Sequence, residues 1–125
     1  VKLSMKIVID KADALFSKYI RLRDKRCVRC GRPGDGKEGI NSLQNSHYFG
    51  RRSESTRFDP ENCDALCMGC HQRWGSEDKE AYRDFKIKQL GEDGFKKLRM
   101  RSEMYCKKDR KLAYLVVKKM LDTIK

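Results

Sequence analysis

Two pairs of cysteines, each with two residues between its members, constrain this chain more than any other feature. The first pair is Cys27 and Cys30, and the second is Cys67 and Cys70. Thiolates at this spacing can bind one metal ion from a tight turn, and two such pairs make a tetrahedral four-sulfur site of the kind that zinc occupies. The sequence therefore predicts a structural Zn²⁺ site formed by these four cysteines.

Two of the six cysteines, Cys63 and Cys106, stand outside the pairs. Six cysteines in a short chain are also compatible with three disulfides, which is the alternative to a zinc site. The paired spacing and the lysine-rich composition favour reduced, metal-binding thiols over disulfides. We expect Cys63 and Cys106 to be partly buried free thiols, because an unpaired cysteine behaves as a small apolar residue.

The charge balance limits the kind of partner. The 125 residues include 30 Lys and Arg against 18 Asp and Glu, a formal net charge of +12. Such an excess favours a polyanionic partner, first nucleic acid and second an anionic membrane surface. No apolar run approaches the roughly 20 residues that span a bilayer, which excludes an integral membrane protein. We expect one domain over 1–125 and, because Val1 is not an initiator Met, the C-terminal part of a longer protein.

Apolar periodicity predicts helices on both sides of the cysteine pairs. Three- and four-residue steps between apolar residues predict an amphipathic helix over about 10–24. After the second pair, Ser76 is a suitable N-cap for a helix that Gly91 ends, with another helix starting at Glu92. A last helix with a basic outer face is predicted over about 108–123. Its inner face is expected to include Leu112, Leu115, Val116, Met120, Leu121 and Ile124.

The 36 residues between the two cysteine pairs, 31–66, exceed the ~15–20 of a plain zinc ribbon. A further structure must therefore be inserted there. Extended character over 40–48 predicts the first strand of a β-hairpin, with a polar, basic tip at 50–55 and a return strand near 56–58. The second cysteine pair is expected to open a helix over 67–74, which the following glycine ends.

Three polar residues in or beside the inserted segment can support chemistry. The imidazole of His47 titrates near neutrality, so it can take a proton from water that attacks a phosphodiester. His71, directly after the second pair, can bind a divalent ion that offsets charge on the phosphate. Each residue also has a structural interpretation: His47 as a hydrogen-bonded core histidine, His71 as a substitute zinc ligand or surface residue, and Asn62 as a turn residue. Three arginines can bind neighbouring phosphates: Arg51, Arg52 and Arg57.

The order of these residues is more specific than any one of them. A histidine on a strand (His47), an asparagine in the following loop (Asn62) and a histidine on the next helix (His71) are bracketed by two CxxC pairs. This arrangement resembles the HNH nucleases, also called the His-Me finger or ββα-metal group, in the form that carries a treble-clef zinc site.

Further segments narrow the resemblance to one family. The segments 16–24, 46–49, 56–62, 82–83 and 87–91 are similar to the phage NinG (Rap) recombination proteins. That family is implicated in resolving branched DNA such as Holliday junctions. The similarity extends over roughly 15–98.

The resemblance implies a fold and a function. The expected fold is α+β, mainly α, with a treble-clef ββα-metal core at about 27–75 between flanking helices at about 10–24 and 76–124. The implied activity is a metal-dependent DNA endonuclease that hydrolyses phosphodiester bonds in branched recombination intermediates, in the cytoplasm of the bacterial host. Structural Zn²⁺ and catalytic Mg²⁺ or Mn²⁺ are the implied cofactors. Symmetric resolution of a four-way junction needs two cuts, so a homodimer is the expected assembly, with no membrane partner.

The resemblance also implies roles for single residues. His47 matches the general base, Asn62 the residue that fixes the loop and the base, and His71 the ligand of the catalytic ion. The two cysteine pairs match the structural zinc ligands. From the charge pattern, the residues expected to contact DNA are Arg51, Arg52, Arg57, Lys107, Lys108 and Lys111.

Position 46 departs from the HNH pattern. HNH enzymes generally have Asp or a second His directly before the general base as a ligand for the catalytic ion, and Ser46 stands here. A hydroxyl is a poorer ligand than a carboxylate, so Asn41, Asn45, Asp64 or DNA phosphates are further candidates beside Ser46. The substitution favours the main alternative function, a noncatalytic zinc-stabilised DNA- or RNA-binding module. Another alternative is a general nicking or homing-type HNH endonuclease.

Overall fold

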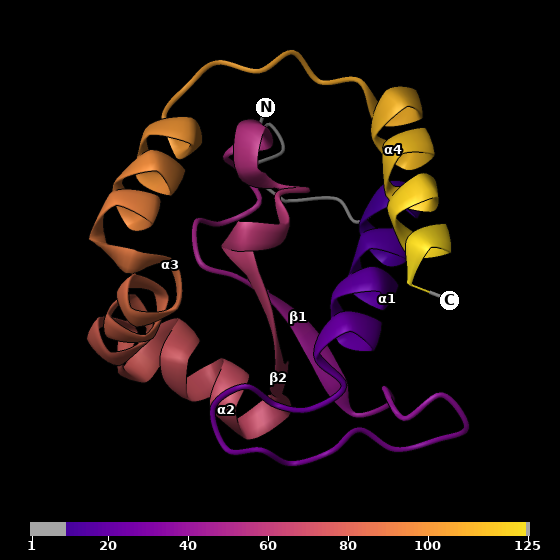
Figure 1. Cartoon of the computed structure of the whole chain (residues 1–125), viewed down its shortest axis with the longest axis vertical. Coiled ribbons are helices and arrows are strands. Elements are labelled where there is room, and N and C mark those ends of the chain that lie inside the picture. The colour runs from indigo at the N-terminus through magenta and orange to yellow at the C-terminus, as the bar shows by residue number, and fades with distance from the viewer. Residues whose placement is uncertain (1–9, 125) are drawn as a thin grey trace, which may run out of the picture.

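A computed structural model describes residues 10–124, and residues 1–9 and 125 lie outside that description. The described residues form a mainly helical α+β structure around a two-stranded sheet (Figure 1), which confirms the expected class. In chain order the helices and strands are α1 (Lys11–Asp24), β1 (Leu43–His47), β2 (Cys63–Cys67), α2 (Met68–Gln72), α3 (Lys79–Ser102) and α4 (Arg110–Thr123). The short helical turns are η1 (Glu54–Thr56), η2 (Pro60–Asn62) and the π-helical η3 (Arg73–Glu77).

The two strands pair antiparallel, with Leu43 opposite Cys67 at one end and His47 opposite Cys63 at the other. Figure 1 shows the sheet between α3 on one side and the α1–α4 pair on the other. All five residues of β2 are buried, as expected for a short strand covered on both faces. Helix α2 follows β2 directly and packs back against both strands, so the end of β1 and α2 can contribute to one site.

The return strand predicted near 56–58 is wrong, because β2 is the strand that pairs with β1. Thr56 instead ends η1, and its Oγ1 donates a hydrogen bond to Ser53 Oγ at 3.0 Å. The side chain of Arg57 turns inward to the carboxylate of Asp13 in α1. These contacts fold the segment between the strands into a compact loop. They also give the Thr56 hydroxyl and the Arg57 guanidinium partners inside the protein, whereas a hairpin strand would have exposed both groups.

A capping box starts α1. The Asp10 side chain accepts a hydrogen bond from Asp13 N–H at 3.1 Å, and the Asp13 side chain accepts one from Asp10 N–H at 3.0 Å. Phe16 and Ile20, one helical turn apart, lie on the buried face, which agrees with the predicted amphipathic helix. Lys25, with φ of 60°, ends α1 in the left-handed conformation. The chain then enters the turn of the first cysteine pair.

The predicted boundary between the two helices after the second cysteine pair is wrong. The chain stays helical through Gly75 and Ser76, which lie in η3. The hydroxyl of Ser76 donates to the backbone oxygen of Gln72 at 3.0 Å, so it does not cap the next helix. Asp78 does so instead, because its side chain accepts a hydrogen bond from Ala81 N–H at 3.1 Å.

Gly91 interrupts α3, as predicted. Its φ of 80° and ψ of 164° are not helical, and glycine adopts them without a Cβ clash. Helix α3 therefore has two segments, 79–90 and 92–102. Tyr82 in the first segment and Leu98 in the second are buried.

Helix α4 is rotated relative to the prediction. Its buried residues are Leu121, as predicted, and Val117, which was not predicted. Four residues of the predicted inner face are exposed instead: Leu112, Leu115, Val116 and Ile124. Ion pairs at the start of the helix account for the difference. Arg110 contacts Asp10 at 2.5 Å and Glu54 at 2.8 Å, which turns the face that begins at Arg110 toward α1.

Buried side chains from α1, both strands, η3, α3 and α4 form one cluster in the described part of the chain. Trp74 stacks on Tyr82 with ring centroids 4.7 Å apart, and Phe16 packs edge-on against Phe58 at 5.8 Å. Among residues 10–124, no helix combines the length and the apolarity that crossing a membrane requires.

Candidate functional site

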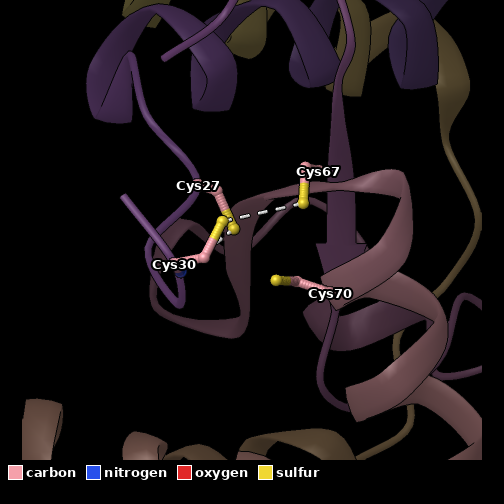
Figure 2. Close-up of side chains that lie close together, drawn as sticks. All are labelled: Cys27, Cys30, Cys67 and Cys70. Carbon is pink, nitrogen blue, oxygen red and sulfur yellow. Dashed lines mark hydrogen bonds between the residues drawn. The ribbon is translucent and has the colours of Figure 1, made fainter. Parts of the chain in front are cut away.

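The four cysteines of the two pairs converge, as predicted (Figure 2). Their sulfur atoms all lie within 4.8 Å of one another, and Cys30 Sγ and Cys67 Sγ are 3.8 Å apart. In a tetrahedral site with Zn–S bonds of about 2.3 Å, the sulfur atoms are roughly 3.8 Å from each other. The arrangement can hold a metal ion such as zinc. None of the six cysteines, all within the described residues, forms a disulfide.

Two kinds of local structure supply the sulfurs. The first pair lies in a tight turn after α1, which Gly31, with φ of 81°, closes by donating its N–H to Cys27 O at 2.8 Å. The second pair spans the end of β2 and the first turn of α2. The two halves contact each other, since Val28 N–H donates to Ala65 O at 3.0 Å. The strand β2 thus supports both cysteine pairs.

Hydrogen bonds to sulfur favour the thiolate form of Cys27, whereas burial and the neighbouring thiols raise the pKa of Cys70 to about 12. Burial opposes the charge on Cys27, but backbone N–H groups, that of Cys30 among them, lower the pKa of Cys27 to about 7. Arg29 Nη1 donates to Cys70 Sγ at 3.2 Å. Thiolates are the form that binds metal, so these contacts suit a metal centre. Although His71 follows Cys70 directly, it is not part of this cluster.

The two cysteines outside the pairs differ from each other. Cys63 is fully buried in β2, whereas Cys106 is exposed in the linker between α3 and α4. Burial, together with the charge of Asp64, raises the pKa of Cys63. Both are free thiols, as predicted, but partial burial is wrong for both, since Cys63 is fully buried and Cys106 is exposed.

A cavity of about 410 Å³ brings His47, from the end of β1, together with His71, from α2. We call it the histidine cavity. Ser46 also lines it. The rest of the wall consists of aromatic and small residues and one lysine: Tyr48, Phe49, Gly50, Trp74, Gly75, Lys79 and Tyr82. The structure therefore places the two histidines of the sequence motif, and the serine before the first, in one site.

His47 is held in one tautomer and one protonation state. Its Nε2 lies 2.9 Å from Arg57 O, and because a carbonyl oxygen only accepts, Nε2 carries the proton. Nδ1 is then the basic nitrogen, and it is buried with no hydrogen-bond partner within residues 10–124. Burial and the nearby charge of Arg51 lower the pKa of His47 to about 4, and the same two causes lower the pKa of His71. Both imidazoles are neutral at pH 7.

Asn62 is fully buried and fixes the segment that follows His47. Its Oδ1 accepts a hydrogen bond from Phe49 N–H at 2.8 Å. Its Nδ2 donates to Phe49 O at 2.8 Å and to Thr56 O at 3.1 Å. The backbone oxygen of Asn62 accepts from Tyr48 N–H at 2.8 Å. Asn62 therefore holds two residues of the cavity wall in place beside His47.

Comparison with known proteins gives the family. A family model described as "Bacteriophage Lambda NinG protein" matches residues 2–120. The chain belongs to the NinG family. It is also similar to a protein of Lactococcus phage SK1 named "Probable HNH endonuclease", with 34% identity over 62 residues. That alignment covers 49% of this chain and 66% of the relative, just under two thirds of its length. No solved structure matches.

This NinG-family chain offers few ligands for a catalytic divalent ion. Among the described residues, no carboxylate lines the histidine cavity, and Ser46 contributes only a hydroxyl. Asp64 lies opposite Ser46 across the sheet, but its Oδ2 binds Lys86 Nζ at 3.1 Å. Neither Asn41 nor Asn45 lines the cavity. Because Mg²⁺ and Mn²⁺ prefer oxygen-rich shells that include carboxylates, these residues do not fit an ion that the protein holds by itself.

The expected phosphate contact of Arg57 is wrong. Its side chain is buried, and its Nε lies 2.9 Å from Asp13 Oδ1. Burying an arginine requires such a partner, so this guanidinium stabilises the fold and is not presented to DNA. The backbone oxygen of Arg57 contacts the site, because it accepts the hydrogen bond from His47 Nε2.

Arg51 and Arg52 line a second cavity, of about 370 Å³, together with Ser102. We call it the arginine cavity. It shares Phe49 and Gly50 with the histidine cavity, so the two are adjacent. In this NinG-family protein, two of the three predicted arginines therefore lie next to the histidines.

The three predicted lysines lie elsewhere. Lys107 and Lys108 are exposed in the linker between α3 and α4, and Lys111 is exposed in the first turn of α4. Lys111 lines a different cavity, together with Asp10 and Tyr114. None of the three lysines lines the histidine or the arginine cavity.

Three residues of the histidine cavity were not found by sequence reasoning: Trp74, Lys79 and Tyr82. Trp74 and Lys79 follow His71 by about one and two helical turns, so helical spacing from His71 is the signal that points to them. That signal could be used only if the helix continued through η3, whereas the glycine at position 75 suggested that the helix ended there.

Proposed function

We propose that this NinG-family protein is a DNA endonuclease that hydrolyses phosphodiester bonds in branched DNA, such as Holliday junctions, during phage recombination. The observation that carries the proposal is the histidine cavity, which a neutral His47 with an unpartnered Nδ1 lines together with His71. The name of the SK1 relative supports the endonuclease class. The formal charge of +12 supports a polyanionic substrate.

The proposed chemistry is hydrolysis with His47 as general base. Nδ1 of His47 takes a proton from a water molecule, and the water oxygen attacks phosphorus. The bond from phosphorus to the 3′ oxygen breaks, which leaves a 5′-phosphate and, after that oxygen takes a proton from solvent, a 3′-hydroxyl. The hydrogen bond from Nε2 to Arg57 O supports this role, because it keeps the proton off Nδ1.

The frame of the site belongs to the same proposal. We propose zinc as the ion of the four-cysteine cluster, and β1, β2 and α2 as a treble-clef ββα core. Asn62 would act as a positioning residue, since it anchors the loop after His47. The role of His71 as ligand of a catalytic Mg²⁺ or Mn²⁺ stays a prediction, because the cavity supplies no carboxylate among the described residues.

DNA contacts and assembly are also part of the proposal. Arg51 and Arg52 in the arginine cavity lie next to the histidine cavity, which supports contacts to a phosphate that neighbours the scissile one. Such contacts position the backbone and do not read sequence. Two cuts in a four-way junction favour a homodimer, acting in the host cytoplasm.

Cleavage of a synthetic four-way junction tests the function. The protein and a His47→Ala variant are incubated with labelled junction and with linear duplex of the same sequence, without added divalent ion or with Mg²⁺ or Mn²⁺. We expect the parent to cut the junction faster than the duplex. We expect His47→Ala to cut at least about 100-fold more slowly, because general base catalysis contributes typically 10²–10⁴-fold.

The same assay separates the alternatives. Tight junction binding without cleavage by the parent under every ionic condition would support a noncatalytic zinc-stabilised nucleic-acid-binding module. The lack of a carboxylate among the described residues that line the cavity favours this alternative. Equal cutting of junction and linear duplex would favour a general nicking or homing-type enzyme. Unchanged cutting by His47→Ala would remove His47 as the base.

A further inference from the structure

The histidine cavity has a distinctive charge. Among the described residues that line it, Lys79 is the one lysine or arginine. No acidic side chain of residues 10–124 lines the cavity. A cavity with a lysine and no carboxylate suits an anion better than a divalent cation.

Two acidic residues near Lys79 or the cavity, Asp78 and Asp64, have other partners. The carboxylate of Asp78 caps α3 through Ala81 N–H. The carboxylate of Asp64 binds Lys86 and also accepts a hydrogen bond from Tyr82 Oη at 3.0 Å. Within the described part of the chain, no carboxylate forms an ion pair with Lys79. Its ammonium group is therefore available to a ligand.

The backbone that carries Lys79 is fixed against the cavity. Lys79 is the first residue of α3, directly after its N-cap. One turn further along, Tyr82 stacks on Trp74 at 4.7 Å and packs edge-on against Tyr48 at 5.1 Å. These three aromatic residues also line the cavity, so the packing that builds the wall also sets where α3 starts. The Cα of Lys79 is therefore held in place, and its long side chain extends from that point.

We propose that Lys79 is a catalytic residue that binds the scissile phosphate in the histidine cavity. Its ammonium group would stabilise the negative charge that builds on the phosphoryl oxygens as water attacks. No carboxylate among the described residues lines the cavity to hold a metal ion for that role. The inference rests on the proposed endonuclease function and deepens it, because it names the group that opposes the phosphate charge. Lysine suits the role as a compact point charge with three donors.

Binding without cleavage tests the phosphate contact. Junction affinity is measured without added Mg²⁺ or Mn²⁺ over a range of salt concentrations for the parent, Lys79→Gln, Lys79→Arg and Lys88→Gln. Lys88 is exposed on α3, and nine residues from Lys79 place it about half a turn away around the helix. Loss of one phosphate contact should reduce the slope of log K against log salt by about 0.9. We expect this for Lys79→Gln, and not for Lys79→Arg or Lys88→Gln.

Single-turnover cleavage at saturating protein tests the catalytic role. We expect Lys79→Gln to cut about 100-fold more slowly, as when one donor to a developing charge is removed. Lys79→Arg should recover part of the rate, and Lys88→Gln should match the parent. Zinc content and the thermal midpoint of each variant show that the fold is intact.

The outcomes separate this inference from the endonuclease proposal. An unchanged salt slope for Lys79→Gln would overturn the phosphate contact, whether or not the parent cuts DNA. A reduced slope with an unchanged cleavage rate would place Lys79 on another phosphate and overturn the catalytic role. A parent that binds but never cuts would refute the endonuclease and with it the catalytic role, while the slope would still decide the contact.

Discussion

At the scale of the residue, the surroundings of His47 decide what its imidazole can do. Burial and the charge of Arg51 lower its pKa to about 4, and Arg57 O fixes the proton on Nε2. A base with so low a pKa is weak. A DNA phosphate that pairs with Arg51 would cancel part of that charge and raise the pKa of His47, while the larger effect of burial would remain. Substrate binding would thus improve the base at the moment it is needed.

This pKa has a consequence for stability. In the unfolded chain a histidine has a pKa of about 6.5, so between that pH and about 4 the unfolded state binds a proton that folded His47 does not. The free energy of unfolding should therefore fall as the pH is lowered through this window. Replacing His47 by Gln removes this dependence. Urea unfolding of parent and His47→Gln from pH 4 to pH 8 measures it.

Zinc release at acidic pH affects both proteins and cancels in the comparison. We expect the stability of the parent relative to His47→Gln to decline below pH 6.5 and to level off near pH 4. A difference that stays constant across the range would contradict a buried, neutral His47.

At the scale of the element, α1 organises the surroundings of the site. Asp13 in α1 lies within 4.0 Å of three arginine side chains: Arg51, Arg57 and Arg110. Arg51 and Arg57 belong to the loop between the strands, and Arg110 begins α4. Burial by itself would raise the pKa of Asp13, but hydrogen bonding and charge from Arg57 lower it. One carboxylate therefore ties three parts of the chain together.

Removing that charge should be costly. Asp13→Asn leaves the buried guanidinium of Arg57 without its counter-charge, and breaking a buried ion pair typically costs about 3–5 kcal/mol. We expect the free energy of unfolding to fall by about 3 kcal/mol in denaturant titration. The matched control is Asp84→Asn, which disrupts the exposed Arg83–Asp84 pair and should change stability by less than about 1 kcal/mol. Equal effects of the two substitutions would refute this role of Asp13.

Elements were predictable from sequence where local rules decide them. The cysteine pairs, the amphipathic α1 and the break at Gly91 follow from spacing, periodicity and glycine geometry. The second strand and the face of α4 were not, because partners distant in sequence decide them. Arg57 is drawn out of a hairpin by Asp13, and Arg110 sets the rotation of α4. The place of Lys79 depends on such a tertiary feature too, the continuation of the helix through η3.

At the scale of the whole molecule, the four-cysteine cluster connects the turn after α1 with β2 and α2. β1 pairs along the full length of β2, and α2 carries His71. The cluster therefore lies at the junction of the elements that bring His71 to His47. In our proposal the four sulfurs act as a frame, and the segment inserted between the cysteine pairs supplies the base.

The metal content follows from this arrangement. We expect one zinc per chain in protein purified under reducing conditions, measured by elemental analysis together with protein concentration. Cys67→Ser should lose the zinc and unfold at lower temperature, since binding free energy of a structural zinc is folding free energy. Cys106→Ser, at an exposed cysteine outside the cluster, should keep both. Protein without zinc, with its paired cysteines oxidised, would contradict the zinc site.

The most direct test of the central claim, hydrolysis by water that His47 activates, is cleavage of a four-way junction in H₂¹⁸O. We predict that the parent places one ¹⁸O atom in the 5′-phosphate of each cut strand and leaves a 3′-hydroxyl, and that His47→Ala yields almost no cut strand in the same time. Mass spectrometry of the product ends measures the label. Absence of cut strands from the parent, unlabelled 5′-phosphates, or equal labelled product from His47→Ala would contradict the claim.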